Sequence, residues 1–409
     1  MTISYIILFL FAALSFAELF AVNNKVIRNK SVGLCFLAPI LMITMVVLCA
    51  IRGGTQGDYV TYKEVFELMT DPTDLSMPMN FFYEPLYSIL QLVVKALFNS
   101  FQVFCLVIGL IVLVMQYCFA MEYTPNPLKS LQNENINGET VLTEKTYFRK
   151  CCCNNKICKK FYGEYFFTVM FVLWGLYRAN IITTRSSIAL CICLYSTKYI
   201  ESENFKKFMI CVLVACGFHY SAAIFIPSYF VFKYHGNLWK KLLILMVGCI
   251  FGVVGIVPLA NAFARIVGGQ LENKILNYTT INNEFMAGTG LDANSGAILL
   301  IKAIANIGIL LVIGVYLWNT YKNNRRYEGY FNLYLIGCIL YMATLNVNYA
   351  FARLSIYYNI FQVPMMLYLV SKEKYSFNSR LLHWFILAIY IIFRFLVNTA
   401  GNEIVYFWQ

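Results

Sequence analysis

Long apolar segments, separated by short polar ones, recur along the whole chain. Most of them approach the roughly 20 residues that a helix needs to cross a bilayer, so the pattern predicts an all-α polytopic membrane protein with about 11 or 12 transmembrane helices. The predicted spans are Ile3–Val22, Gly33–Ile51, Phe101–Ala120, Tyr165–Ile182, Ser186–Tyr199, Phe208–Phe232, Leu242–Leu259, Ala297–Trp318, Phe331–Leu345, Leu354–Val370 and Leu381–Val397. A further segment, Pro85–Phe98, is shorter and more polar.

The composition agrees with this pattern. Of the 409 residues, 60% are hydrophobic and 13% are charged, and the mean hydropathy is +0.64. A soluble domain is about half apolar and about a quarter charged. We therefore expect a single integral membrane domain over residues 1–409.

Lysines and arginines gather in particular loops, which indicates the orientation of the chain. Cytoplasmic loops carry an excess of these residues, so we place the basic loops in the cytoplasm. Five of the loops hold Lys25, Arg28 and Lys30; Lys198, Lys206 and Lys207; Lys233, Lys240 and Lys241; Lys322, Arg325 and Arg326; and Lys372, Lys374 and Arg380. The cysteine-rich loop 121–164 adds Lys129, Lys145, Arg149, Lys150, Lys156, Lys159 and Lys160. Loop lysines that face anionic lipid account for most of the net charge of +12, so no nucleic-acid partner is expected.

This orientation has two consequences, and the start of the chain adds a separate expectation. Pro85–Phe98 does not span, because an extra crossing would put the loop 121–164 outside, so we expect a re-entrant or interfacial helix. Phe208–Phe232 enters and leaves on one side and breaks near Gly217-Phe218-His219, beside protein or a water-filled cavity. Ile3–Val22 follows no basic residue, so we expect an anchor that starts outside and not a cleaved signal.

The outer face then consists mainly of the loops 52–84 and 260–296 and a few helix ends. Four arginines lie there, against the bias that keeps positive charge inside: Arg52, Arg178, Arg185 and Arg353. Arginine suits phosphate because its planar fork donates two hydrogen bonds and stays charged. The alternative is that these side chains extend to lipid headgroups.

Three residues are candidates for acid–base chemistry. His219 lies at the predicted break, where it is either a hydrogen-bonded core residue or a catalytic group. Asp58 and Glu84 are the outer carboxylates nearest the membrane, and either could take a proton from a sugar hydroxyl. Their structural alternatives are a turn for Asp58 and a helix cap beside Pro85 for Glu84. Glu18, within an apolar segment, pairs either with an arginine or with a neighbouring helix.

A metal or cofactor site is not indicated. The chain has three histidines, without HxxxH or HExxH spacing. Cys151-Cys152-Cys153 and Cys158 lack the paired CxxC of a zinc ribbon and lie in a loop that we place in the reducing cytoplasm. We expect reduced thiols, no metal and no cofactor.

The motifs resemble those of the EpsG/Wzy-type polysaccharide polymerases. Arg52-Gly-Gly-Thr-Gln-Gly57-Asp58-Tyr59-Val-Thr-Tyr62, followed by Glu84-Pro85, is similar to their amino-terminal signature. Asn180 to Ala189 with Arg185, then Phe218-His219-Tyr220-Ser221, then Arg353-Leu-Ser-Ile-Tyr357-Tyr358, resemble the later motifs in the same order.

The resemblance implies a glycosyltransferase of the large polytopic (GT-C-like) type in the bacterial cytoplasmic membrane, with its active site on the outer face. Such enzymes join polyprenyl-diphosphate-linked oligosaccharide units into O-antigen, capsule or exopolysaccharide, without a metal, and release polyprenyl diphosphate. Membrane lipids, a chain-length regulator and a flippase are the further partners implied. On this reading His219, Asp58 and Glu84 are catalytic candidates, and Arg52, Arg185, Arg353 and Arg178 bind the diphosphate. Tyr59, Tyr62 and Tyr357 contact sugar.

Two other functions remain open. A transporter or flippase for a lipid-linked or anionic saccharide would use the same arginines without making bonds, but the chain shows no internal repeat. A membrane acyltransferase would need a histidine–aspartate pair at a suitable spacing, which we do not find.

Overall fold

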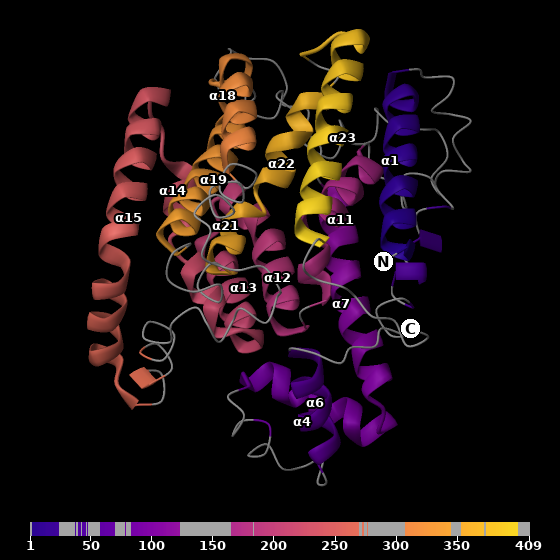
Figure 1. Cartoon of the computed structure of the whole chain (residues 1–409), viewed down its shortest axis with the longest axis vertical. Coiled ribbons are helices and arrows are strands. Elements are labelled where there is room, and N and C mark those ends of the chain that lie inside the picture. Colours follow the sequence, from indigo (N-terminus) through magenta and orange to yellow (C-terminus); the bar gives the residue numbers. More distant parts are fainter. Residues whose placement is uncertain are drawn as a thin grey trace, which may run out of the picture.

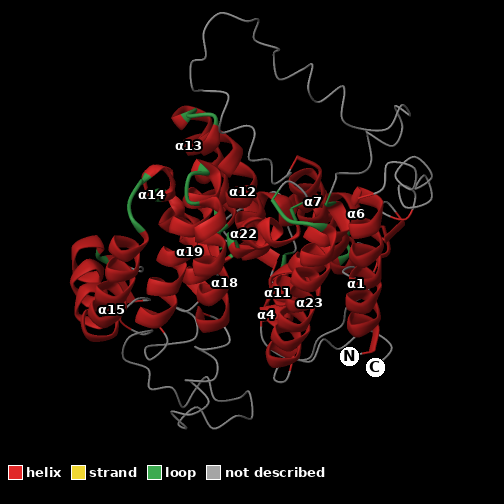
Figure 2. Cartoon of the chain, turned by 90° about the horizontal axis from the view of Figure 1, so that it is seen from above, coloured by secondary structure: helices red, strands yellow, loops and turns green. Residues whose placement is uncertain are grey.

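The computed structural model describes residues 2–23, 58–69, 83–122, 165–182, 184–269, 307–344, 353–371 and 374–399, with a few positions at 37, 40–41, 43–45, 47, 78, 272–273 and 276. Figure 2 shows that the elements of this part of the chain are helices, and no strand occurs in it. They are α1 (Thr2–Asn23), α4 (Asp58–Leu68), α6 (Pro85–Phe98), α7 (Phe101–Glu122), α11 (Phe166–Ile182), α12 (Thr184–Glu201), α13 (Phe205–Phe218), η1 (Tyr220–Phe225), α14 (Ser228–Lys233), α15 (Leu238–Val267), α18 (Ile309–Tyr321), α19 (Arg325–Thr344), η4 (Arg353–Ser355), α21 (Ile356–Asn359), α22 (Gln362–Leu367), η5 (Tyr368–Val370) and α23 (Phe377–Thr399).

Two helices of this set, over Phe101–Ala120 and Phe377–Leu396, are long and apolar enough to cross a membrane. Tyr5–Phe20, Pro85–Phe98 and Phe166–Leu176 are apolar but shorter. The helical class and the presence of apolar spans therefore agree with the sequence pattern, while the number of crossings stays a prediction. Most of the predicted span Gly33–Ile51 and the cysteine-rich loop 121–164 lie outside the described residues.

The first and last helices pack side by side in opposite directions (Figure 1). The ring of Tyr5 contacts Phe395, with centroids 5.2 Å apart, and Phe20 contacts Phe377 at 5.0 Å. The start of α1 and the end of α23 therefore lie at one end of the molecule, as the predicted orientation requires.

Glu18 joins α1 to α11, in agreement with the expected contact to a neighbouring helix. Its carboxylate accepts hydrogen bonds from the backbone N–H groups of Phe167 and Thr168, at 3.1 and 2.9 Å. These N–H groups belong to the first turn of α11 and have no partner within the helix. Glu18 thus caps α11, and α11 runs antiparallel to α1. The next helix, α12, therefore begins at the end of the molecule where α1 begins.

The predicted break in Phe208–Phe232 is confirmed. The helix α13 ends at Phe218, and the chain returns through η1 and α14. The ring of Phe205, at the start of α13, contacts Tyr229 of α14 at 4.9 Å, and Lys233 lies 3.8 Å from Glu203. The two ends of this hairpin therefore meet, as expected for a segment that enters and leaves on one side.

Helix α6 has the bounds that the sequence predicts, and its two sides are reversed relative to a helix of a soluble protein. Its outward side is apolar, with Leu97 68% exposed, whereas Gln91 on the inward side is fully buried. Figure 1 shows α4 and α6 at the lower end of the molecule, beyond the ends of the central helices. An apolar outer side at the end of the bundle fits the expected interfacial helix.

Helix α15 extends further than expected. It continues to Val267, so the first part of the predicted loop 260–296 is helical. Alanines at 260, 262 and 264 favour the helix after the apolar run ends. Gly268 and Gly269 then end it with φ of 69° and 64°, in the left-handed region that glycine tolerates best.

The predicted span Leu354–Val370 is also divided, into η4, α21, α22 and η5. Pro364 lies within it and cannot donate the hydrogen bond that a continuous α-helix would need there.

Candidate active site at the broken helix

The candidate site lies where α13 ends. His219 is extended, with φ −158° and ψ 114°, and its N–H still reaches the carbonyl of Ala215 at 2.8 Å. Gly217 lies directly against α6, because a Cβ there would be 2.6 Å from Cδ1 of Leu86. This close approach puts the break beside the beginning of α6.

Glu84 faces the break from the start of α6. Pro85 is the first residue of the helix, and a residue before proline is confined to extended conformations. Glu84 accordingly has φ −72° and ψ 151°. It occupies the N-cap position, but its carboxylate makes no capping hydrogen bond, contrary to the structural role expected from the sequence. The side chain is directed to the break instead.

The carboxylate of Glu84 accepts hydrogen bonds from three elements. Its Oε1 lies 2.8 Å from Nδ1 of His219 and 3.2 Å from the backbone N of Tyr220. Its Oε2 lies 2.9 Å from Nη1 of Arg185, in the first turn of α12. With Glu84 only 3% exposed, these groups replace the water that a carboxylate would otherwise bind.

Glu84 is held in its ionised form. Burial alone would raise the pKa of Glu84, but the hydrogen bond from His219 and the charges of Arg185 and His219 outweigh burial. The pKa of Glu84 therefore lies below its ordinary value. An ionised carboxylate is available to fix the orientation of the histidine.

That orientation determines which nitrogen of His219 can act. A carboxylate only accepts hydrogen bonds, so Nδ1 of His219 is the donor. In a neutral imidazole the lone pair is then on Nε2. The side chain of His219 is 29% exposed, so the ring is held in place without being sealed off.

Arg185 is surrounded by tyrosine rings. Its Cζ lies 4.6 Å from the ring centre of Tyr83, 5.3 Å from that of Tyr62 and 5.9 Å from that of Tyr87. Its Nε also donates to the hydroxyl of Tyr62 at 3.2 Å. The faces of aromatic rings attract a guanidinium, so this cage stabilises the cation that orients Glu84. The geometry fits Arg185 as a positioning residue for the carboxylate.

The three predicted sugar-binding tyrosines lie in different surroundings. Tyr62 is buried in the cage around Arg185, and the ring of Tyr59 packs against Phe101 at 5.3 Å. Tyr357, in α21, is buried, with its hydroxyl 3.1 Å from Oγ of Ser221 in η1. Tyr357 therefore connects α21 to η1, which follows the break after α13.

The other candidate residues belong to other parts of the chain. Asp58 is the first residue of α4, while Arg353 begins η4 and is exposed. Arg178 lies near the end of α11, and Arg52 lies outside the described residues.

Sequence reasoning missed three residues at this end. Tyr83 and Tyr87 flank Glu84-Pro85 and complete the cage, which an aromatic on each side of an acidic residue could have suggested. Arg394, in α23, is 6% exposed, and its Nε and Nη1 have no hydrogen-bond partner in the described part of the chain. It adjoins Phe395, which contacts Tyr5, so it belongs to the same end as the start of α12. An arginine late in the last apolar segment was the available signal.

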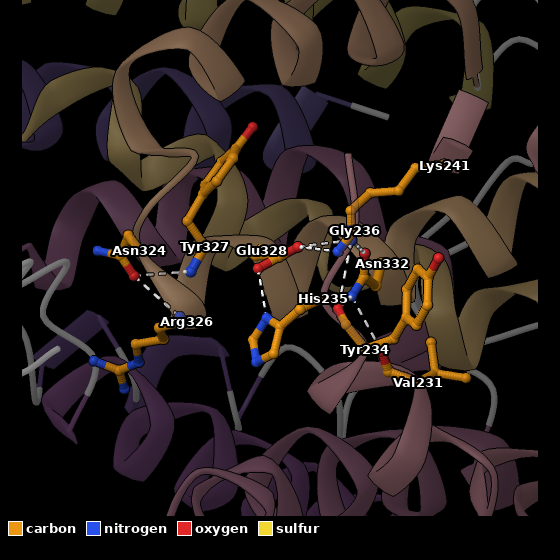
Figure 3. A network of polar contacts seen from close by, with 10 residues as sticks. All are labelled: Val231, Tyr234, His235, Gly236, Lys241, Asn324, Arg326, Tyr327, Glu328 and Asn332. Carbon is orange, nitrogen blue, oxygen red and sulfur yellow. Dashed lines mark hydrogen bonds and ion pairs between the residues drawn. The ribbon is translucent and has the colours of Figure 1, made fainter. Parts of the chain in front are cut away.

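A second carboxylate, at the opposite end, has a matching set of donors. Figure 3 shows Glu328 of α19 between His235, Gly236 and Lys241. The distances are 2.7 Å from Nδ1 of His235, 3.1 Å from the backbone N of Gly236 and 2.9 Å from Nζ of Lys241. We expected Lys241 in a loop that faces lipid, but it is only 2% exposed and lies inside the protein. Because this arrangement recurs, it is the neighbours of the Glu84 group that distinguish it from the group around Glu328.

The described residues contain no group of three or more His, Cys, Asp and Glu side chains that could hold a metal ion. The chemistry that the Glu84 group itself offers is that of an oriented base beside buried cations.

Comparison with known proteins identifies a family. The model of the EpsG family matches residues 34–132 and 141–408, which is most of the chain. No curated protein and no solved structure matches.

Proposed function

The chain belongs to the EpsG family, and from this premise we propose that it is a metal-independent polysaccharide polymerase of the membrane. It would join polyprenyl-diphosphate-linked oligosaccharide units on the outer face of the bacterial cytoplasmic membrane, in a multi-pass fold like that of large polytopic glycosyltransferases. The observation that carries the proposal is the ionised Glu84 that holds His219 at a broken helix, at the end of the molecule that also holds the buried Arg394.

In this mechanism His219 accepts the proton of the acceptor. A hydroxyl oxygen of the acceptor sugar attacks the anomeric carbon of the donor, and its proton passes to Nε2 of His219. Glu84 keeps the lone pair on Nε2 before the transfer and stabilises the imidazolium afterwards. The Glu84 group thus supplies orientation and charge at one atom.

The leaving group needs positive charge. The bond from the anomeric carbon to the diphosphate oxygen breaks, and its electron pair goes to the diphosphate. Arginines that are not already bound to Glu84 are suited to neutralise this charge: Arg353, Arg394 and, from the sequence, Arg178 and Arg52. Arg394 is the strongest of these candidates, because two of its guanidinium nitrogens are buried without an acceptor among the described residues.

The competing function is transport of the same lipid-linked saccharide. A broken helix that returns on itself and buried cations would also serve a transporter. The two functions differ in product, since a transporter moves single units to the surface and makes no bond between them.

The test is His219→Ala in cells that have no other copy of the protein. A polymerase that has lost its base should leave single repeat units at the cell surface and reduce long polymer by about 100-fold or more. The matched control is His235→Ala, which removes the equivalent bond to Glu328 at the opposite end and should leave polymer length unchanged.

Two outcomes would contradict the proposal. Loss of single units from the surface in His219→Ala would favour transport. Polymer of normal amount and length in this variant would show that His219 is not the base. With the purified protein and a lipid-linked repeat unit, polymerisation should also persist in EDTA; its loss would exclude the arginine-based mechanism.

A further inference from the structure

The inward side of α6 has a polar stripe along its centre. Glu84, Ser88, Gln91 and Lys95 follow one another at spacings of three or four residues, which places them on one side of a helix. Ile89, Val93 and Leu97 occupy the opposite, exposed side. A helix that directs its polar residues inward and its apolar residues outward fits a lipid environment outside and a polar ligand inside.

Two members of this stripe are buried without a partner in the part of the chain that the structure describes. Ser88 and Gln91 are both 0% exposed. In the described part of the chain, neither Oγ of Ser88 nor either polar atom of the Gln91 amide has a hydrogen-bond partner. Leaving such groups unsatisfied costs about 1–3 kcal/mol each, and two of them on one side of one helix, next to the candidate base, point to a polar ligand there.

We propose that Ser88 and Gln91 form the subsite for the acceptor sugar, binding its hydroxyl groups next to the one that His219 deprotonates. This inference rests on the proposed function. The stripe begins at Glu84, whose Oε1 lies 2.8 Å from Nδ1 of His219, so the proposed subsite and the proposed base meet at the start of α6.

The chemistry of the two side chains selects this ligand class. The Gln91 amide offers a donor and an acceptor side by side, and the Ser88 hydroxyl can act as either, which matches a sugar hydroxyl group. Neither carries a charge, so neither suits the diphosphate. A neutral, hydroxyl-rich saccharide satisfies all the missing bonds.

The location of α6 allows such a ligand to enter. Because the two side chains are fully buried, a sugar reaches them only when α6 tilts away from the bundle while Glu84, at its start, keeps its contact with His219. The exposed apolar side of α6, with Leu97 68% exposed, meets no other described element that would prevent this movement.

The experiment compares Gln91→Leu with the wild-type protein, both purified and supplied with the lipid-linked repeat unit extracted from cells that lack the protein. Leucine conserves the volume of glutamine and removes its hydrogen bonds. We expect the acceptor KM to rise by about ten-fold with kcat within about two-fold, and the unfolding temperature to be unchanged or higher, since an unsatisfied group is removed. Ser88→Ala should act in the same direction, by a smaller factor.

The matched controls are Gln116→Leu in α7 and Ser228→Ala in α14. Gln116 is a buried glutamine whose Nε2 contacts Sγ of Cys191 at 3.9 Å, and Ser228 is a buried serine without a partner in the described residues. Neither lies in α6, and both should leave KM unchanged.

The outcomes separate this inference from the proposed function. A lower unfolding temperature with unchanged KM in Gln91→Leu would mean that the amide serves the fold, and would overturn the subsite. If the wild-type protein makes no polymer, the proposed function fails, and equilibrium binding of the same repeat unit then tests the subsite alone. Equal affinity of wild type and Gln91→Leu would overturn it, and an affinity about ten-fold lower in the variant would support it.

Discussion

Replacing Glu84 by glutamine tests the centre of the site with almost no change in size. The amide has one oxygen, whereas the carboxylate uses both of its own to accept hydrogen bonds. If the amide oxygen faces His219, the NH₂ group meets Nη1 of Arg185, and two donors oppose each other. If the amide turns over, its NH₂ meets Nδ1 of His219 and favours the tautomer with the proton on Nε2.

The magnitudes follow from this geometry. Removing one partner of a buried ion pair costs about 3–5 kcal/mol. The side chain of Arg185 remains 17% exposed and keeps its tyrosine cage, so we expect a smaller loss of folding free energy, of about 2–3 kcal/mol. The effect on catalysis is larger, because the wrong tautomer of His219 cannot accept a proton. By analogy with histidine bases oriented by a carboxylate, turnover should fall by about 100- to 10,000-fold.

The assay is single-turnover polymerisation of a lipid-linked repeat unit by the purified protein, with unfolding followed in the same detergent. Glu328→Gln is the control, since Glu328 has a matching set of donors at the opposite end. It should lose stability to a comparable extent and keep its turnover. If Glu84→Gln retains more than about a tenth of wild-type turnover, or if both variants lose activity in proportion to stability, the oriented-base reasoning is refuted.

Two further predictions concern stability. Glu18→Gln should weaken the cap of α11 and lower the free energy of unfolding by about 1–2 kcal/mol, measured by denaturation in detergent. The control Glu67→Gln removes only an exposed ion pair with Lys63 and should change the free energy of unfolding by less than about 0.5 kcal/mol. Equal effects of the two substitutions would contradict the capping role of Glu18. The low pKa of Glu84 predicts a pH dependence, because a carboxyl whose folded pKa lies below the unfolded value of 4.5 stabilises the fold above that pH. This contribution is lost as the pH falls through the folded pKa, so the stability difference between wild type and Glu84→Gln should shrink below pH 4.5; a difference that grows there would contradict the sign of the shift.

Much of the local structure could be predicted from sequence because it depends on neighbouring residues. The bounds of α6 follow from Pro85 and the apolar run after it, and the break at His219 follows from counting which loops must share a side. The end of α15 could not be read from hydropathy, since alanines extend the helix without adding an apolar run.

The contacts of the site could be predicted only in part. The sequence identified Glu84, Arg185 and His219 separately, but Arg185 and Glu84 are 101 positions apart, and His219 and Glu84 are 135 apart. The periodicity of apolar residues along the chain does not indicate contacts between residues so far apart in sequence. The family resemblance suggested that Arg185 binds the diphosphate, and the structure adds that two of its donor groups bind Glu84 and Tyr62.

The hairpin of α13, η1 and α14 makes the site depend on both ends of the molecule. Its two feet meet at Glu203 and Lys233, and Asn204 caps α13 there by accepting a hydrogen bond from the backbone N of Lys207 at 3.1 Å. His219 is carried at the tip, about 20 Å away along a helix of this length. A small tilt of the hairpin at the end formed by Glu203 and Lys233 would therefore displace the imidazole of His219 relative to Glu84. A conformational change at the lysine-rich end of the protein would thus alter the position of His219 at the opposite end.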